Sequence, residues 1–105
     1  ATGTADEVRP DEFVLLQNEP NPFHATTTVR LMAPDYGSIN LSIYDCSGRL
    51  VNEVADEARP GVARLVWDGR DASGHLVPTG MYFYRLRVET SNGAYVATRK
   101  MALLR

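Results

Sequence analysis

The turn at residues 68–74, Asp-Gly-Arg-Asp-Ala-Ser-Gly, has the side chains most able to bind a cation. Asp68, Asp71 and Ser73 could offer carboxylate and hydroxyl oxygens to Ca²⁺, which prefers oxygen ligands. The spacing lacks the bidentate glutamate of an EF-hand loop, and Arg70 adds a competing positive charge. We therefore expect a turn held by side-chain to backbone hydrogen bonds, with Asp68 and Asp71 as weak metal candidates and no metal or cofactor bound.

Groups that could perform catalysis are scattered along this sequence. His24 and His75 have no second histidine or cysteine at zinc-ligand spacing, and Cys46 is the single cysteine. The chain has no Gly-x-Ser-x-Gly nucleophile elbow, glycine-rich phosphate loop or paired-carboxylate pattern. We expect that this protein is not an enzyme.

Aromatic side chains raise the alternative of a carbohydrate-binding module, because aromatic rings stack on sugars. Trp67, Tyr82 and Tyr84 alternate in phase with apolar neighbours, a pattern that indicates burial. We expect Tyr36 and Tyr95 to be exposed, and two rings are too few for a binding platform. Sugar binding remains an alternative.

Composition indicates one soluble domain. The chain has 105 residues, with 44% hydrophobic and 23% charged residues and a net charge of −2. This charge gives no electrostatic attraction to nucleic acid or to an anionic membrane, and no apolar run is long enough to insert into a bilayer. Residues 1–12 have no hydrophobic signal-peptide stretch, so we expect them to be a linker from an upstream domain in a longer protein.

Alternation of apolar and polar residues predicts strands along the rest of the chain. The expected strands lie at residues 13–16, 26–32, 38–44, 50–55, 63–67, 81–88 and 95–104. Turn signals separate them, including Asp45 to Gly48 and Asn92-Gly93. About seven short strands predict an all-β, immunoglobulin-like antiparallel sandwich of two sheets, with an SH3-like or other small barrel as the alternative.

The alternation also predicts which side chains face the core. We expect inward rows of Ile39, Leu41 and Ile43, of Ala63, Leu65 and Trp67, and of Tyr82, Tyr84, Leu86 and Val88. Met81 and Phe83 on the opposite face suggest a central strand covered on both sides at one end. We expect four outward arginines to form one solvated basic face with cross-strand partners such as Glu53 or Glu89, and a docking surface is the alternative: Arg64, Arg85, Arg87 and Arg99.

Residues 17–23, Gln-Asn-Glu-Pro-Asn-Pro-Phe, contain two prolines that cannot occupy a helix interior or a central strand. Proline there would protect an exposed sheet edge, because it offers no N–H to a pairing strand. We expect Asn18 and Asn21 to bond nearby backbone N–H groups in Asx-turns. We expect Phe23 to be buried as an anchor.

Four motifs in order resemble a known bacterial family. They are LQNEPNPF with TTTVR after it, IYDCSGRLV, WDGRDASG, and PTGMYFYRL followed by the terminal RKMALLR. Together they resemble the C-terminal sorting domains of the type IX (Por) secretion system, which share their profile with the immunoglobulin-like domain of the flagellar hook-capping protein. The resemblance covers residues 13–105, which we expect to form the sorting domain, with the linker at 1–12.

The resemblance implies a targeting role at the C-terminus of a larger secreted protein. The implied partners are the type IX translocon, a sortase-like peptidase that cuts in the linker, and an upstream cargo domain, with the outer-membrane surface or the medium as the destination. It assigns translocon recognition to the last strands and the tail: Pro78, Gly80, Tyr82, Arg99, Lys100, Leu103, Leu104 and Arg105. Family tails commonly end in a lysine-bearing basic motif, whereas this chain ends Leu-Leu-Arg. A retained immunoglobulin-like spacer or docking module is the main alternative.

Overall fold

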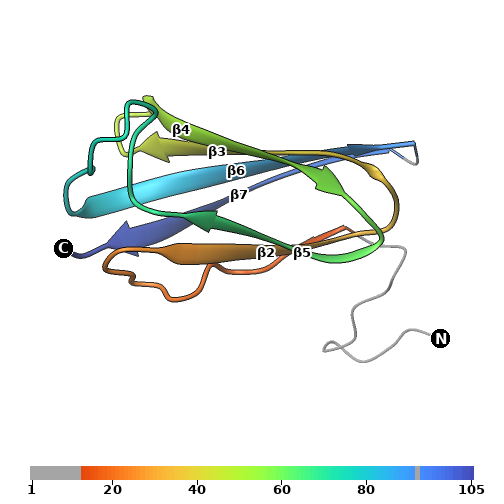
Figure 1. Ribbon diagram of the computed structural model, residues 1–105, viewed down its shortest axis with the longest axis horizontal. Helices are drawn as coiled ribbons and strands as arrows, with labels where there is room; N and C mark the ends of the chain where they lie inside the picture. Colours follow the sequence, from red (N-terminus) through yellow and green to blue (C-terminus); the bar gives the residue numbers. More distant parts are fainter. Residues whose placement is uncertain (1–12, 92) are drawn as a thin grey trace.

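The computed structural model describes residues 13–91 and 93–105, and regular secondary structure in that part of the chain is entirely β. Seven strands follow one another along the chain (Figure 1): β1 (Val14–Leu15), β2 (Thr27–Ala33), β3 (Gly37–Asp45), β4 (Leu50–Ala58), β5 (Gly61–Trp67), β6 (Gly80–Thr90) and β7 (Gly93–Leu103). The expected strands are confirmed, with ends shifted by up to three residues.

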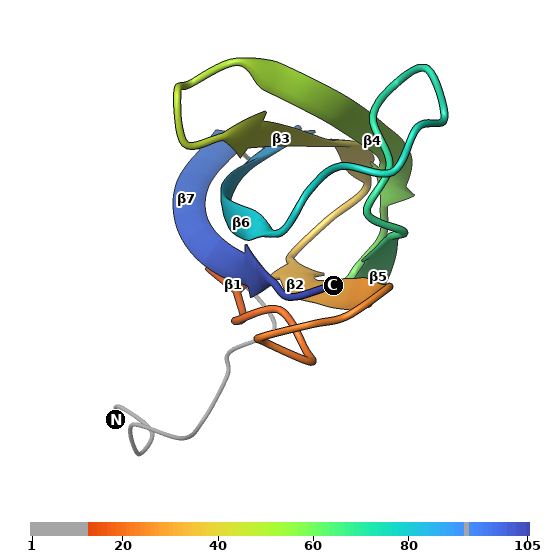
Figure 2. The ribbon, with the colours of Figure 1, turned by 90° about the vertical axis from the view of Figure 1, so that its left-hand side faces the viewer.

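The strands form two antiparallel sheets packed face to face (Figure 2). One sheet has the order β1-β2-β5 and the other has the order β4-β3-β6-β7. β3 and β6 are neighbours in the larger sheet although they lie far apart in the sequence. The chain crosses between the two sheets after β2, β4 and β5. This arrangement confirms the immunoglobulin-like sandwich predicted from the sequence.

The core lies between the sheets and contains the inward rows predicted from alternation. Ile39, Leu41 and Ile43 of β3 are at most 2% exposed, and the four predicted positions of β6 at most 4%. Trp67 contacts the rings of Phe23 and Tyr82, with ring centroids 5.6 and 5.5 Å apart. Ala63, the third member of the β5 row, is half-buried.

The prediction that β6 is covered on both faces at one end is wrong. The strand is central, but the outward side chains of Met81 and Phe83 are 44% and 36% exposed. The physical reason is that the second sheet covers one face only, and the chain supplies no further layer in the described residues.

Asp45 closes the turn from β3 to β4 as predicted. The N–H of Gly48 donates to the Asp45 carbonyl over 3.0 Å, and the Asp45 carboxylate accepts from the N–H groups of Ser47 and Arg49. Gly48 has a φ of 89°, which glycine adopts without steric cost. The pairing register shifts between Ile43 and Tyr44, where the turn joins the strand.

Candidate functional site: the C-terminal face

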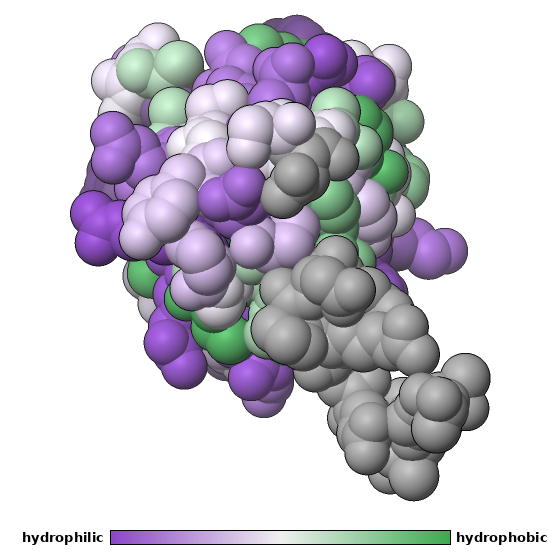
Figure 3. Space-filling model, turned by 90° about the vertical axis from the view of Figure 1, so that its right-hand side faces the viewer, coloured by the Kyte–Doolittle hydropathy of each residue, from purple (hydrophilic) through white to green (hydrophobic). Residues whose placement is uncertain are grey.

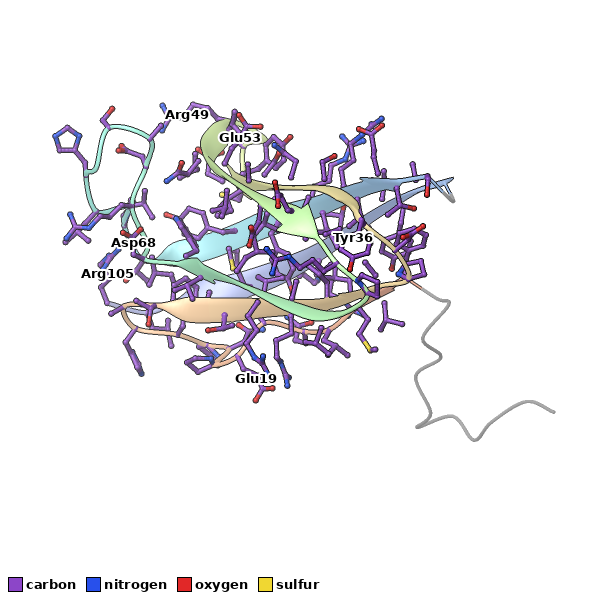
Figure 4. All side chains as sticks on the ribbon, turned by 45° about the vertical axis from the view of Figure 1, so that its right-hand side comes forward. Glu19, Tyr36, Arg49, Glu53, Asp68 and Arg105 are labelled. Carbon is purple, nitrogen blue, oxygen red and sulfur yellow. The ribbon has the colours of Figure 1, made fainter. Side chains whose placement is uncertain are left out.

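Three of the four sequence motifs meet at one end of the sandwich. We call this end the C-terminal face; it comprises the β3–β4 turn, the β5–β6 loop, the start of β6 and residues 104–105. Figure 1 shows the chain end beside that loop and turn, and Figure 4 shows Arg49, Asp68 and Arg105 at this end and Tyr36 at the other. The folding of two sheets therefore brings together segments that are separate in the sequence.

The C-terminal strand is held by the proline segment, residues 17–23. The N–H of Phe23 donates to the carbonyl of Ala102 and the N–H of Leu104 donates to the carbonyl of Phe23, each over 2.9 Å. The N–H of Ala102 also donates to the Asn21 side chain over 3.0 Å. Phe23 is fully buried, as predicted, so this anchor ties the last strand to the core.

The predicted Asx-turns at Asn18 and Asn21 are wrong. Asn18 is 1% exposed, and its amide donates to the carbonyl of Pro20 and to the hydroxyl of Thr27. Asn21 accepts its hydrogen bond from Ala102, which is 81 residues away in the chain. Local turn chemistry did not decide these side chains, because other hydrogen-bond partners were available in the folded chain, Thr27 for Asn18 and Ala102 for Asn21.

Arg105 is bonded to the β5–β6 loop rather than extending into solvent. Its guanidinium donates to the carbonyl of Val77 over 2.6 Å and to that of Gly69 over 2.7 Å. Its N–H donates to the Thr79 hydroxyl over 2.9 Å. The preceding carbonyl, of Leu104, lies 2.7 Å from Nδ1 of His24. The last two residues are thus part of the folded surface.

The residues assigned to translocon recognition divide into two groups in the structure. Tyr82 and Leu103 are 4% and 0% exposed, so they support the surface from below. The other members are accessible in whole or in part: Pro78, Gly80, Arg99, Lys100, Leu104 and Arg105. A partner that binds the folded domain would contact only this second group.

A hollow of about 260 Å³ opens on the C-terminal face. Its wall comes from the β3–β4 turn, including Asp45 and Arg49, and from the stretch Val77 to Tyr82. The Tyr82 hydroxyl donates to the carbonyl of Pro78 over 2.6 Å, which fixes the start of β6. Burial raises the pKa of Tyr82, so the hydroxyl keeps its proton and the bond across the neutral range.

Asp45 has a lowered pKa. The main cause is the hydrogen bond from the hydroxyl of Ser47, followed by the bond from the N–H of Arg49. Each donor stabilises the ionised carboxylate. Asp45 also pairs with the guanidinium of Arg49 at 3.4 Å, so the exposed arginine is positioned beside the hollow.

The carboxylates of the acidic turn at residues 68–74 accept hydrogen bonds from nearby backbone N–H groups, as expected. Asp71 accepts from the N–H groups of Ser73 and His75, and Asp68 accepts from the N–H of Arg70. The guanidinium of Arg70 in turn donates to the Gly74 carbonyl. Among the described residues, no group of three or more histidine, cysteine or acidic side chains is placed to hold a metal. The weak candidates Asp68 and Asp71 therefore have an evident structural role.

The two aromatic rings considered for sugar binding lie in different environments. Tyr36 is 67% exposed, as expected. Tyr95 is half-buried and stacks on Phe13, with ring centroids 5.4 Å apart and planes 3° from parallel, so the expectation of an exposed ring there is wrong. Its inward position on β7 pairs it with Val88 of the core.

The expected single basic face does not form. Arg85 and Arg87 project from the outer face of β6, whereas Arg64 lies on β5 of the other sheet. Arg99 falls on the core-facing row of β7 and donates to the carbonyl of Leu15 over 3.1 Å. Arg87 pairs with Glu89 on its own strand at 3.3 Å. Strand order and side-chain parity separate the four arginines.

Figure 3 views the end of the sandwich opposite the C-terminal face, where hydrophilic residues are interspersed with small apolar areas. No helix in the described ranges 13–91 and 93–105 is long and apolar enough to cross a membrane.

The two packed sheets define an immunoglobulin-like β-sandwich, and sequence comparison identifies the family. Residues 21–98 match the FlgD Ig-like domain, so the chain belongs to the FlgD Ig-like domain family. This is a small all-β class that is typically non-catalytic. No curated protein sequence matches the chain.

Similar solved structures include components of a secretion system and of the flagellum. The chain is similar to dimeric latent PorU from Porphyromonas gingivalis, with 24% identity, a TM-score of 0.75, and coverage of 89% of this chain but 9% of PorU. It is similar to PorZ, an essential surface component of the type-IX secretion system of the same bacterium, with 22% identity, a TM-score of 0.54, and coverage of 99% of this chain and 13% of PorZ.

The flagellar component among these structures is FlgD. FlgD from Xanthomonas campestris, described as essential for flagellar assembly through hook capping, has 23% identity and a TM-score of 0.62, with 88% of this chain and 67% of FlgD covered. At these identities the likenesses establish the shared fold.

Proposed function

We propose that this domain is a non-catalytic C-terminal module of a larger secreted bacterial protein and targets that protein to type IX secretion. The observation that carries the proposal is the placement of residues 102–105. Residues 102–105 are bonded to Phe23, Val77 and Gly69, so the tail contributes to a formed surface. The fold shared with PorU and PorZ supports the same route.

The exposed part of the C-terminal face is the proposed contact with the translocon. Pro78, Leu104 and Arg105 lie on this face, and Lys100 lies on β7 close by. Tyr82 and Leu103 act indirectly, because they are buried and hold the contact residues in place. If the translocon recognises this folded surface, mutations in the distant core that unfold the domain would abolish recognition. Recognition of a free tail would survive such mutations.

The proposal assigns residues 13–105 to the sorting domain and residues 1–12 to the linker that joins it to the cargo. A sortase-like peptidase would cut in this linker, which lies outside the described residues. The cargo would then remain at the outer-membrane surface or enter the medium. Small and acidic residues in the linker suit an accessible cleavage site.

The test uses a fluorescent reporter fused ahead of residues 1–105 in a bacterium with a working type IX system. Deleting residues 99–105 would remove the buried Met101 and Leu103 and unfold the domain, so a surface variant is needed. Leu104→Ser combined with Lys100→Gln changes exposed side chains only. The control is Arg59→Gln with Arg64→Gln, at two exposed cations in the β4–β5 turn and on β5.

We expect export of the reporter with the unmodified domain and with the control, and periplasmic retention with the Leu104/Lys100 variant. Mass spectrometry of the exported product should place its new C-terminus within residues 1–12. Retention of every fusion in the periplasm would refute the targeting role.

A retained spacer or docking module is the second candidate, and the likeness to FlgD supports it. FlgD uses this fold in a flagellar hook cap, outside type IX secretion. Export that is unaffected by the Leu104/Lys100 variant, with the domain still attached to the reporter at the surface, would favour this alternative.

A further inference from the structure

We propose that a cluster of cations along β7 binds an extended acidic peptide segment of a partner protein. The cluster, here the basic rim, consists of Arg85, Arg99 and Lys100. Arg99 and Lys100 line a hollow of about 400 Å³ together with Gln17, Phe83 and Thr98, and Arg85 of β6 lies opposite Thr98 at its side.

The first argument is unbalanced charge. Four other arginines pair with carboxylates, namely Arg30, Arg49, Arg70 and Arg87. In the described part of the chain no carboxylate pairs with any member of the basic rim. Phe83 pairs with Lys100 and Arg85 with Thr98 across the β6–β7 ladder, so Arg85 and Lys100 are diagonal neighbours on one face. Neighbouring like charges repel and an anion bound between them relieves that repulsion, although the net charge of the whole chain is −2.

The second argument is the apolar floor of the hollow. Phe83 is 36% exposed although it lies on a central strand, and it is next to Arg85 along β6 and to Lys100 across the ladder. An aromatic ring flanked by cations is suited to side chains with both a carboxylate and a methylene stem. An acidic peptide can therefore contact both the cations and the Phe83 ring, whereas inorganic phosphate would contact the cations alone.

The third argument is the free backbone edge of β7. Along its described length, β7 pairs with β6 and, at Leu103, with Phe23. The carbonyl of Lys100 and both backbone groups of Ala102 point away from β6, since they bond Gln17, Asn21 and Phe23. Strand parity gives Val96 and Thr98 the same outward direction, and these groups have no partner in the described residues. An extended chain can use such an edge, whereas a compact anion cannot.

The chemistry of the partner segment follows from the two faces of β7. Lys100 projects outward and Arg99 lies on the core-facing row, so two consecutive carboxylates would reach one cation each. The stretch of β7 before Arg99 is uncharged, which suits threonine and valine in the partner. The expected segment is therefore an uncharged β-forming run next to an acidic pair.

This inference does not depend on the targeting role, because it is measured with purified protein and the targeting role is measured by export in cells. The experiment titrates residues 1–105 into fluorescein-labelled peptides and follows fluorescence anisotropy. The probes are Thr-Val-Thr-Val-Glu-Glu and the reversed sequence, since the edge could pair in either direction. Thr-Val-Thr-Val-Lys-Lys and its reverse serve as charge controls.

We expect one acidic probe to bind and the lysine probes not to bind. Arg85→Gln with Lys100→Gln should weaken binding by about tenfold or more, because neither side chain makes a bond that the fold needs. Arg59→Gln with Arg64→Gln removes the same charge from β5 and the turn before it and should change binding by less than about twofold. N-methylation of the bound probe should abolish binding, because it blocks the backbone bonds to the edge.

Three outcomes would overturn the proposal. Neither acidic probe binds, or both double variants weaken binding equally, or the N-methylated probe binds as well as its parent. A single-stranded oligonucleotide provides one more comparison. If it binds more tightly than the acidic probes and the N-methylated peptide displaces it, the basic rim binds phosphate groups instead.

Discussion

The backbone N–H of Asn18 donates to the hydroxyl of Tyr84 over 3.0 Å inside the core. Both residues are almost wholly buried, at 1% and 0% exposure. Asn18 lies in the proline segment, and Tyr84 lies near the middle of β6 in the larger sheet. This bond therefore connects the proline segment to a central strand of the larger sheet.

Replacing Tyr84 by phenylalanine should destabilise the domain by about 1–3 kcal/mol, because the buried N–H of Asn18 would have no acceptor. Urea denaturation followed by tryptophan fluorescence measures the change. Tyr36→Phe, at an exposed ring, is the control and should stay within about 0.5 kcal/mol of the unmodified protein. Equal stability of the two variants would show that the Asn18 bond contributes nothing.

Removing the guanidinium of Arg105 should loosen the β5–β6 loop. Arg105→Gln loses two bonds to the carbonyls of Gly69 and Val77, which water can partly replace, so the expected loss of stability is about 1 kcal/mol. Hydrogen exchange should increase in the loop and remain unchanged in β3. Arg105→Lys should fail to restore protection, since a single ammonium lacks the fork that reaches both carbonyls. Full protection in the lysine variant would contradict this role.

Gly37 should tolerate no side chain. A Cβ at this position would lie 1.9 Å from the carbonyl oxygen of Glu89, a backbone atom of the adjacent strand β6. Gly37→Ala must force β3 and β6 apart, and we expect a loss of at least about 2–3 kcal/mol in thermal or urea unfolding. Gly74→Ala is the matched control: it is strained by its φ of +87° but meets no atom within 4 Å, so it should cost about 1 kcal/mol.

Acid should weaken the β3–β4 turn through Asp45. The pKa of this carboxyl is lowered in the folded protein, chiefly by the Ser47 hydroxyl, so its contribution to stability is present above the ordinary value of 3.8 and is lost as the pH falls through the folded value. NMR titration of the Ser47 and Arg49 amides should report a midpoint below 3.8. Asp45→Asn should remove that titration; a midpoint at or above the ordinary value would contradict the capping role.

Alkali should unfold the domain through its buried tyrosines. Burial raises the pKa of Tyr84 above its ordinary value of 10.0, and the hydrogen bond from the Asn18 backbone opposes this rise in part. The neutral hydroxyl therefore contributes stability that is present below the unfolded pKa and is lost as the pH rises through the folded one. Phenolate absorbance should show Tyr84 ionising together with unfolding, whereas in Tyr84→Phe the alkaline loss of stability should be smaller. An unchanged alkaline loss in that variant would exclude Tyr84 as its source.

Local pattern was enough to predict much of the fold. The alternation of Ile39, Leu41 and Ile43 indicates a half-buried strand, because period two places every second side chain on the same face. Asp45 with Gly48 predicts the following turn for an equally local reason. The hairpin between β6 and β7 was predicted from Asn92-Gly93, of which Asn92 lies outside the described residues.

The resemblance proposed which residues form the candidate site, and their geometry came only from the structure. The motifs containing Pro78 and Arg105 were identified by resemblance, but nothing local shows that Arg105 bonds the carbonyls of Val77 and Gly69. Likewise, Asn21 looks like an ordinary turn residue until Ala102 is beside it. Hydrogen bonds between distant segments leave no periodic signal in a sequence.

By itself the sequence determined the strands, their turns and the inward rows, because backbone geometry and burial impose a short-range period on side chains. Only the tertiary structure decided which strands are neighbours and which cations remain unpaired. Arg99 and Arg85 look alike in the sequence, yet one crosses to Leu15 and the other lies beside Phe83. Strand order depends on the total burial and hydrogen bonding of two packed sheets, which no single segment specifies.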